Sequence, residues 1–537
     1  MKSIIFTIMA VVFFAGCGGS STGGSGGDGG TSGGSDSKYQ LTYKGLRFFA
    51  PALTQSSYKL AQVDDKVFES LTPLQKREVA DKLLATLFFG YPQPLLEEKI
   101  SRGNFISSLF RQLHQDINDK AAIEEEIRNS KKFYHNSNTD DEVNDVLARL
   151  YVMQNPDHYF LQNWIAYILT QTIMFSPAYE LESSHMPNVE RVYNALVRNI
   201  EEEATISYST YLHMISSDNW RRFRSPEDNG REMMEIYTLL FDDALVPVAG
   251  KALQNWKLDR NNDTLVIGLN ENTEPLSLFG TTVVNGDDFY RELAKSSLFQ
   301  KGVTSRLVDF FFTNESKSKK DQIIAKIVQS NPQRWEDILL QIVFSKAYLL
   351  ESTRAKSAEE LFYSLTKKIE YKHYKYTFKE FAAALEQMHQ ATMKYKLGKL
   401  DRVPLDTLSF INYHKYIRER VMIRRANPDK SNNYKDWDSF GFGASFIGDD
   451  RFSLNSADPK ASLDSFVRYL FISTISREPT PQEVALFEGH MLEQKEDGLE
   501  YASGLNLVKT SGRTDAAILI LDYISRLSEL YQFKKVR

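Results

Sequence analysis

The chain has 537 residues and a formal net charge of -5, with 42% hydrophobic and 25% charged residues. This composition is typical of a globular protein and excludes a largely disordered chain or one with many membrane spans. The weak net charge does not by itself select nucleic acid or a membrane surface as a partner. Cys17 is the single cysteine, which excludes an intramolecular disulfide and a thiolate zinc site built by one chain.

The N-terminus resembles a bacterial lipoprotein signal with its lipobox. Lys2 gives a basic start, residues 4–14 form a mostly apolar run, and the small residues Ala15 and Gly16 precede Cys17. The run is too short for an ordinary transmembrane helix. The resemblance implies cleavage before Cys17 and attachment of lipid, including palmitate, to that cysteine. An uncleaved anchor and an ordinary secretory signal are the alternatives.

Residues 18–37 are Gly, Ser and Thr interrupted only by Asp28 and Asp36. This composition predicts a flexible linker, which would hold a folded body roughly 25 Å from a lipid surface. Gly18 stands where an aspartate would retain a lipoprotein at the inner membrane. The resemblance therefore implies an outer-membrane anchor, with the protein on the periplasmic or the cell-surface side.

The rest of the chain has an overwhelmingly helical pattern, with capped starts followed by apolar residues at three- and four-residue spacing. The ranges that predict helices are 72–89, 105–117, 140–153, 159–175, 189–216, 225–240, 287–298, 305–312, 319–329, 335–350, a start capped at Ser357, 463–475 and 514–531. Two Gly-containing stretches break the pattern. Residues 256–286, with short β-branched runs, predict a loop or small hairpin, and residues 441–458 predict a second irregular loop.

We therefore predict a mostly α fold: a large multi-helix body with small irregular or β-hairpin insertions. The predicted parts are the lipoprotein signal and lipobox 1–17, the linker 18–37, a main helical domain 38–366 and a C-terminal helical part 367–537 packed on it.

The helix predicted over residues 225–240 carries the densest local signals. Ser225 is placed to cap it, Pro226 suits the first helical position, and Asp228 completes an S-x-x-D capping box. One predicted face is apolar, and it consists of Met233, Tyr237, Leu240 and Phe241. The opposite face is charged.

The charged face supports two interpretations. Four carboxylates, from Glu227, Asp228, Glu232 and Glu235, could converge for general acid–base catalysis or for a divalent cation. Alternatively, Arg231 lies one turn from both Glu227 and Glu235, which predicts a structural ladder of ion pairs. If that ladder is buried, loss of Arg231 would destabilise the fold by about 3–5 kcal/mol.

A second group of oxygen-bearing side chains suggests half of a calcium loop. Asp259, Asn261 and Asp263 occupy positions 1, 3 and 5 of such a loop, but Thr264 and Asn270 replace its turn glycine and its bidentate glutamate. A polar turn is the alternative. The nine histidines show no metal-ligand spacing, and we predict no cofactor.

Residues 367–430 hold fifteen Lys or Arg against seven Asp or Glu, interleaved with tyrosines. Such a stretch predicts binding of an anionic polymer, with Arg418, Arg420, Arg424 and Arg425 as the contact residues. An ordinary solvated helix face is the alternative. Outside the cell an anionic glycan is a better match than nucleic acid.

Residues 227–235 are similar to the E-N-F-A-R-E-L-L-E signature of a bacterial family known as domain of unknown function 1800. Asp228 and Asn229 stand at its asparagine and aromatic positions. Residues 248–256 resemble its A-R-A-L-T-G-W segment without the glycine before Trp256. The resemblance covers roughly residues 44–524. It implies a secreted protein encoded beside a sulfatase-like partner family, and no biochemical activity comes with it.

The sequence thus predicts an exported lipoprotein that binds a partner protein, such as a sulfatase-like one, or an anionic polymer. The alternative function is a polymer-modifying hydrolase that uses the carboxylates of residues 227–235.

Overall fold

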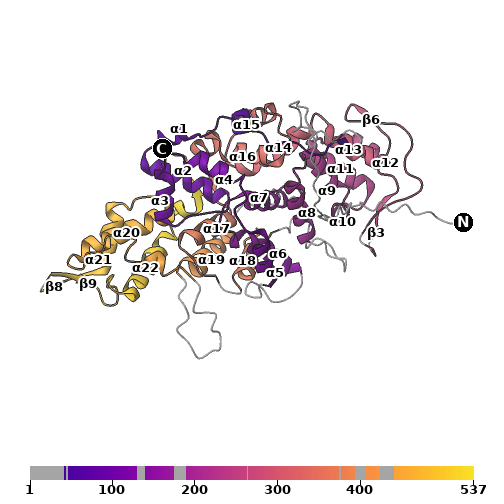
Figure 1. Cartoon of the computed structure of the whole chain (residues 1–537). Helices are drawn as coiled ribbons and strands as arrows, with labels where there is room; N and C mark the ends of the chain where they lie inside the picture. The colour runs from indigo at the N-terminus through magenta and orange to yellow at the C-terminus, as the bar shows by residue number, and fades with distance from the viewer. Residues whose placement is uncertain are drawn as a thin grey trace, which may run out of the picture.

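The computed structural model describes residues 42–43, 46–129, 139–174, 189–259, 261–262, 264–373, 376–392, 407–423, 441–496 and 498–536. The predicted signal, the linker and Cys17 lie outside these residues. Helices dominate an elongated body, and the strands of the described residues form only two-stranded pairs (Figure 1). The mostly α prediction is confirmed. Within the described residues, no helix is both long and apolar enough to cross a membrane.

The N-terminal third begins with a short hairpin and continues as helices that pack around the buried helix α7. Its elements are β1 (Thr42–Tyr43), β2 (Leu46–Arg47), the 3-10 turn η2 (Gln55–Ser57), α1 (Asp65–Glu69), α2 (Pro73–Thr86), α3 (Gln93–Ser101), α4 (Phe105–Gln112), α5 (Lys120–Asn129), α6 (Thr139–Val152) and α7 (His158–Thr170). Thr72 begins α2 with a complete capping box to Gln75. Every residue of α7 after His158 is buried, as its apolar sequence predicts.

The prediction of one continuous helix over residues 189–216 is wrong. The chain instead forms α8 (Val189–Glu201) and α9 (Ile206–Met214). Between them Glu203 adopts a left-handed backbone with φ of 60°, and the Thr205 side chain accepts a hydrogen bond from the Tyr208 N–H to begin the second helix. A left-handed residue that is not glycine gives no signal in the sequence.

The predicted cap of the next helix is confirmed. After α10 (Ser217–Arg222), the Ser225 side chain accepts from the Asp228 N–H and α11 (Pro226–Thr238) follows. It ends earlier than predicted, because Leu239 takes the left-handed conformation with φ of 58°. Phe241 therefore leaves the apolar face and is 68% exposed. Met233 and Tyr237 are buried, as expected.

Around α11 lie the 3-10 turn η3 (Asp243–Leu245), α12 (Val246–Ala252), α13 (Gly286–Lys295) and α14 (Phe299–Phe311). Two glycines allow α11 and α12 to approach closely. A Cβ atom on Gly230 would lie 2.7 Å from the Ala249 Cβ, and one on Gly250 would lie 2.5 Å from the Glu227 Cγ. The Asn229 amide is buried beside them and accepts a hydrogen bond of 2.7 Å from the Tyr290 hydroxyl of α13.

The insertion predicted at residues 256–286 consists of two antiparallel hairpins. In the first, β3 (Trp256–Asp259) pairs with β4 (Thr264–Ile267), and Trp256 lies opposite Ile267. In the second, β5 (Leu276–Leu278) pairs with β6 (Thr281–Val283). Figure 1 shows β3 and β6 at one end of the body, beside α12 and α13.

The chain then returns to the middle of the molecule. The elements there are α15 (Lys317–Gln329), α16 (Trp335–Val343), the π-helix η4 (Ala347–Glu351), β7 (Arg354–Ala355), α17 (Ala358–Lys368), α18 (Thr377–Gln387), α19 (Thr407–Tyr416) and the π-helix η6 (Ile417–Met422). Ser357 begins α17 with a complete capping box to Glu360, as predicted.

The C-terminal elements form the other end of the body and finish against the N-terminal helices. They are the 3-10 turn η8 (Ser445–Ile447), α20 (Pro459–Ile475), α21 (Pro481–Met491), β8 (Leu492–Lys495), β9 (Gly498–Tyr501), α22 (Thr510–Ile524), α23 (Ser528–Tyr531) and β10 (Gln532–Phe533). Strand β10 pairs antiparallel with β7, with Phe533 opposite Arg354. Strand β10 lies close to α2, because residues of both line one cavity (Figure 1), and one cluster of buried apolar side chains extends from Leu46 to Tyr531.

The close approach of α11 and α12 gives a first prediction. Gly230→Ala should destabilise the protein by about 1–3 kcal/mol, because the added methyl group overlaps the Ala249 side chain in a packed interface. Gly489→Ala is the matched control, since a Cβ on this helical glycine of α21 meets nothing within 4 Å. The control should be neutral or stabilising by up to about 1 kcal/mol. Urea unfolding measures both; equal stability of the two variants would contradict the packing.

Candidate functional site

The four carboxylates predicted on α11 occupy different environments. Glu227 is exposed, Asp228 and Glu235 are half-buried, and Glu232 is buried. Arg231 forms ion pairs with Asp228 at 2.7 Å and with Glu232 at 3.9 Å, which are different partners from the predicted Glu227 and Glu235. The Arg231 side chain is 43% exposed, so its loss should cost less than about 1 kcal/mol rather than the amount expected for a buried ladder.

The predicted calcium residues lie at the turn between β3 and β4, where Asp263 is outside the described residues. One Asp259 carboxylate oxygen accepts from the Asn261 N–H at 2.9 Å, and the other accepts from the Asn262 side chain at 2.8 Å. These hydrogen bonds hold the pKa of Asp259 below its usual range. The carboxylate thus serves the turn itself. Among the described residues, no three His, Cys, Asp or Glu side chains are grouped to hold a metal ion.

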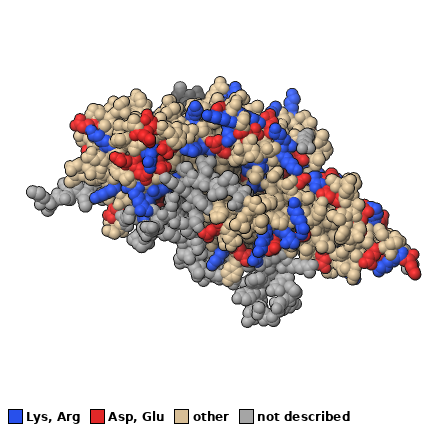
Figure 2. All heavy atoms as spheres, turned by 180° about the vertical axis from the view of Figure 1, so that it is seen from behind, with Lys and Arg blue, Asp and Glu red and all other residues tan. Residues whose placement is uncertain are grey.

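Some basic residues of the stretch 367–430 are buried in the protein interior. The Lys367 ammonium is buried and donates to the Met153 carbonyl at 2.8 Å, and Lys368 is buried against Asp81. Arg418 pairs with Asp522, whereas Arg420 is about half exposed and lies 3.9 Å from Glu380. Arg424 and Arg425 lie outside the described residues. On the face shown in Figure 2, Lys and Arg are interspersed with Asp and Glu.

A different group of basic residues, absent from the sequence predictions, lines a cavity of about 360 Å³ between α2, the end of α20 and the C-terminal strand β10. Its size is at the lower end of the range for small-ligand pockets. Its charged lining comprises Lys82, Lys356, Arg477, Lys534 and Lys535 against Glu78, Asp81 and Glu529. We call it the Lys82–Lys356 cavity. None of the four α11 carboxylates lines it.

Two acidic residues of this cavity, Asp81 and Glu529, form ion pairs. Asp81 pairs with Lys368, and Glu529 accepts ion pairs from Lys534 at 3.2 Å and Arg477 at 3.6 Å. Arg477 is also held by Glu483 at 2.8 Å. These pairs engage Asp81 and Glu529, and the lining as a whole holds more basic than acidic side chains.

Lys82 lies on the buried side of α2. Its ammonium donates to the Ser352 carbonyl at 2.8 Å and to the Ser352 hydroxyl at 3.2 Å, and it lies 4.9 Å from the centre of the Tyr348 ring. All these partners are uncharged. Burial, followed by the nearby Arg354 guanidinium, lowers the pKa of Lys82 to about 7.

Lys356 lies between β7 and α17 and is 5% exposed. Its ammonium is 5.3 Å from the centre of the Phe533 ring, and it has no hydrogen-bond acceptor among the described residues. Burial is the main cause that lowers its pKa to about 8; Lys368 and Arg354 lower it further, while Asp81 and Glu360 act in the opposite direction.

The wall behind these lysines is fixed by a buried ion pair. Arg354 donates to both carboxylate oxygens of Glu360, one of them at 2.7 Å, and to the Tyr348 hydroxyl at 2.6 Å. Glu360 also accepts from the Ser357 N–H at 2.8 Å. The Phe533 ring covers the guanidinium at 4.9 Å. Both terminal nitrogens of Arg354 are thereby engaged by Glu360 and Tyr348.

This arrangement suits a small anion. A buried ammonium without an acceptor is unfavourable, and a carboxylate, sulfate or phosphate supplies both the missing acceptor and the compensating charge. Comparison with known proteins found no matching family model, curated protein or solved structure. The function must therefore be argued from this geometry.

One signal in the sequence points to Lys82. It follows Val79 by three residues and precedes Thr86 by four, so it shares their buried face of α2. A lysine on an apolar helix face is a buried-charge candidate. Lys356 and Phe533 gave no comparable signal, because their burial depends on the pairing of β7 with β10.

The lowered pKa of Lys356 gives a second prediction, about stability. Between about pH 8 and 10.5 the unfolded lysine is protonated while the buried one is neutral, so stability should rise with pH across this window. Below pH 8 the full penalty, on the order of 3 kcal/mol, applies. Lys356→Met should therefore stabilise the protein at pH 7, with the gain shrinking as the pH approaches 10.5.

Urea unfolding at pH 7 and pH 10 measures this difference. A Lys356→Met protein that is less stable than the wild type at pH 7 would show that the ammonium is compensated in the folded state.

Proposed function

We propose that the protein is an exported lipoprotein that binds an anionic glycan, whose acidic group enters the Lys82–Lys356 cavity. The observation that supports this function most directly is the Lys356 ammonium. It is buried in the cavity wall, is 5% exposed and has no acceptor among the residues that the structure describes. A buried cation without a hydrogen-bond acceptor destabilises the fold, and such a group is typical of a binding site.

Two further features support an acidic ligand. Asp81 and Glu529 of the cavity lining are already engaged by Lys368, Arg477 and Lys534, so a bound anion would compensate Lys82 and Lys356. Lys535 at the rim is exposed, which would let it contact a longer polymer. Arg418 and Arg420 do not line the cavity; together with Arg424 and Arg425, which lie outside the described residues, they are a second contact in this proposal.

The hydrolase alternative stays a prediction. It needs two carboxylates facing one substrate, and Glu232 is buried while Glu227 is exposed. The resemblance to domain of unknown function 1800 likewise stays a proposal. Several residues of that resemblance are engaged in packing, as Gly230, Asn229 and Gly250 show.

A third prediction tests binding with D-galacturonate and galactose, which differ by one carboxylate. Calorimetry of the purified full-length protein should detect galacturonate and not galactose. Lys356→Gln should weaken binding by about tenfold or more, because a hydrogen bond to a charged group contributes about 1.5–3 kcal/mol. Binding should also weaken above about pH 8, where Lys356 loses its charge.

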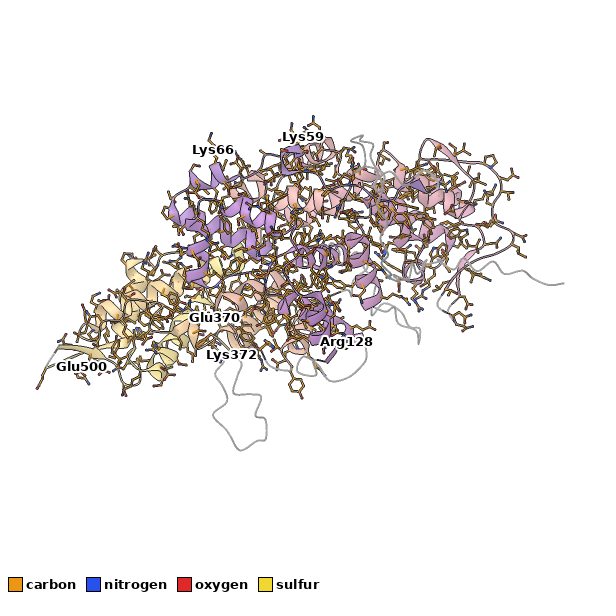
Figure 3. The ribbon with its side chains drawn as sticks, viewed as in Figure 1. Lys59, Lys66, Arg128, Glu370, Lys372 and Glu500 are labelled. Carbon is orange, nitrogen blue, oxygen red and sulfur yellow. The ribbon has the colours of Figure 1, made fainter. Side chains whose placement is uncertain are left out.

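Lys59→Gln is the matched control, since this lysine is exposed at the opposite edge from the basic stretch (Figure 3). It should bind galacturonate as the wild type does. If both sugars bind equally, or if Lys356→Gln binds galacturonate unchanged, the cavity is not an anion site. A protein partner would then be the better proposal.

A fourth prediction concerns the membrane anchor, which rests on the apolar run and on the small residues before Cys17. Cys17→Ser should move the protein from the membrane fraction to the soluble fraction and abolish metabolic labelling with palmitate. Equal membrane association of the two proteins would remove the lipoprotein assignment, without bearing on the cavity.

A further inference from the structure

Lys356 combines two properties that simple anion binding does not require. Its side chain is a primary amine in the wall of a cavity, and its surroundings disfavour the protonated form. Burial, Lys368 and Arg354 bring its pKa to about 8. About one tenth of such an amine is neutral at pH 7, against less than about one thousandth for an ordinary lysine. A neutral amine is a nucleophile for carbonyl carbon.

The geometry places the other groups that this chemistry needs in the same cavity. The ammonium groups of Lys82 and Lys356 lie near the same ring, that of Phe533, at 5.9 Å and 5.3 Å from its centre. Two of the three donors of Lys82 are used by Ser352, which leaves one for an anionic group. Asp81 also lines the cavity and acts electrostatically on Lys356, while its carboxylate is paired with Lys368.

We infer that Lys356 forms an imine with small compounds that carry both a carboxylate and an aldehyde or ketone, such as the open chain of an acidic sugar. The inference rests on the proposed anion site, because the carboxylate must enter the cavity for the carbonyl carbon to meet Lys356. The amine nitrogen attacks that carbon, and the carbonyl oxygen takes up a proton to give a carbinolamine. Loss of water then forms the C=N bond, with no oxidant or reductant required.

Lys356 can act as the nucleophile in this cavity, whereas the neighbouring Arg354 cannot. Arg354, beside Lys356, is committed to Glu360 and Tyr348 and cannot become a nucleophile, because a guanidinium stays protonated. The exposed Lys535 at the rim is available to attract the anion. Lys356 is thus the buried amine of the cavity that combines a lowered pKa with the absence of a hydrogen-bond acceptor, within the part of the chain that the structure describes.

Pyruvate and lactate provide a matched pair of probes, since they carry the same carboxylate and only pyruvate has a ketone. The full-length protein would be incubated with each at pH 7.5 in the presence of cyanoborohydride, which reduces an imine to a stable amine. Peptide mass spectrometry then locates the adduct. We expect a pyruvate adduct on Lys356 at an occupancy at least about tenfold above that on the exposed Lys59, and none with lactate.

Lys356→Arg keeps the positive charge and should lose this adduct while retaining the circular-dichroism spectrum. Pyruvate labelling of Lys356 no greater than that of Lys59 in the wild-type protein would overturn the inference, and this comparison needs no variant to fold. Galacturonate binding by calorimetry is independent of the trap. Binding without labelling would leave the anion site in place and remove only the imine, whereas the absence of both would remove both.

Discussion

The ion pair between Arg354 and Glu360 is the interaction on which the cavity depends. Both side chains are almost fully buried, so neither charge has solvent to compensate it, and removal of one partner from such a pair typically costs about 3–5 kcal/mol. The pair connects several segments, because Arg354 also donates to Tyr348 and is covered by Phe533. Tyr348 in turn shares a hydrogen bond of 2.7 Å with Thr86 of α2.

Lys82 and Lys356 lie close to this pair but lack its compensation. Arg354 has a carboxylate of its own, whereas Lys82 has only the neutral oxygens of Ser352. The fold therefore tolerates two buried amines whose protonation it disfavours. The residues of α11 differ from these lysines. Gly230 packs closely against Ala249, and the Asn229 amide accepts a hydrogen bond from Tyr290. The similarity of residues 227–235 to the family signature is therefore evidence of shared helix packing more than of shared chemistry.

Features that depend on neighbours in the sequence were predictable. The helix starts at Thr72, Ser225 and Ser357 follow from a capping residue and the three positions after it, and all three are observed. The break at Glu203 and the early end of α11 at Leu239 were missed. In residues other than glycine, the left-handed backbone conformation is imposed by tertiary packing and has no local sequence pattern. The same limit applies to the site. The pairing of β7 with β10 brings Lys356 and Phe533 together. No local pattern predicts a pairing between strands that are so far apart in the sequence.

That pairing has a consequence for how the site comes into being. The chain is made from its N-terminus, so Lys82 is present long before Phe533 and Lys535 are added. Contacts of such large sequence separation form late and slowly. The cavity is therefore incomplete in every chain that lacks β10, even when the preceding helices have already folded. Ligand binding would in this way distinguish chains that contain β10 from fragments that lack it.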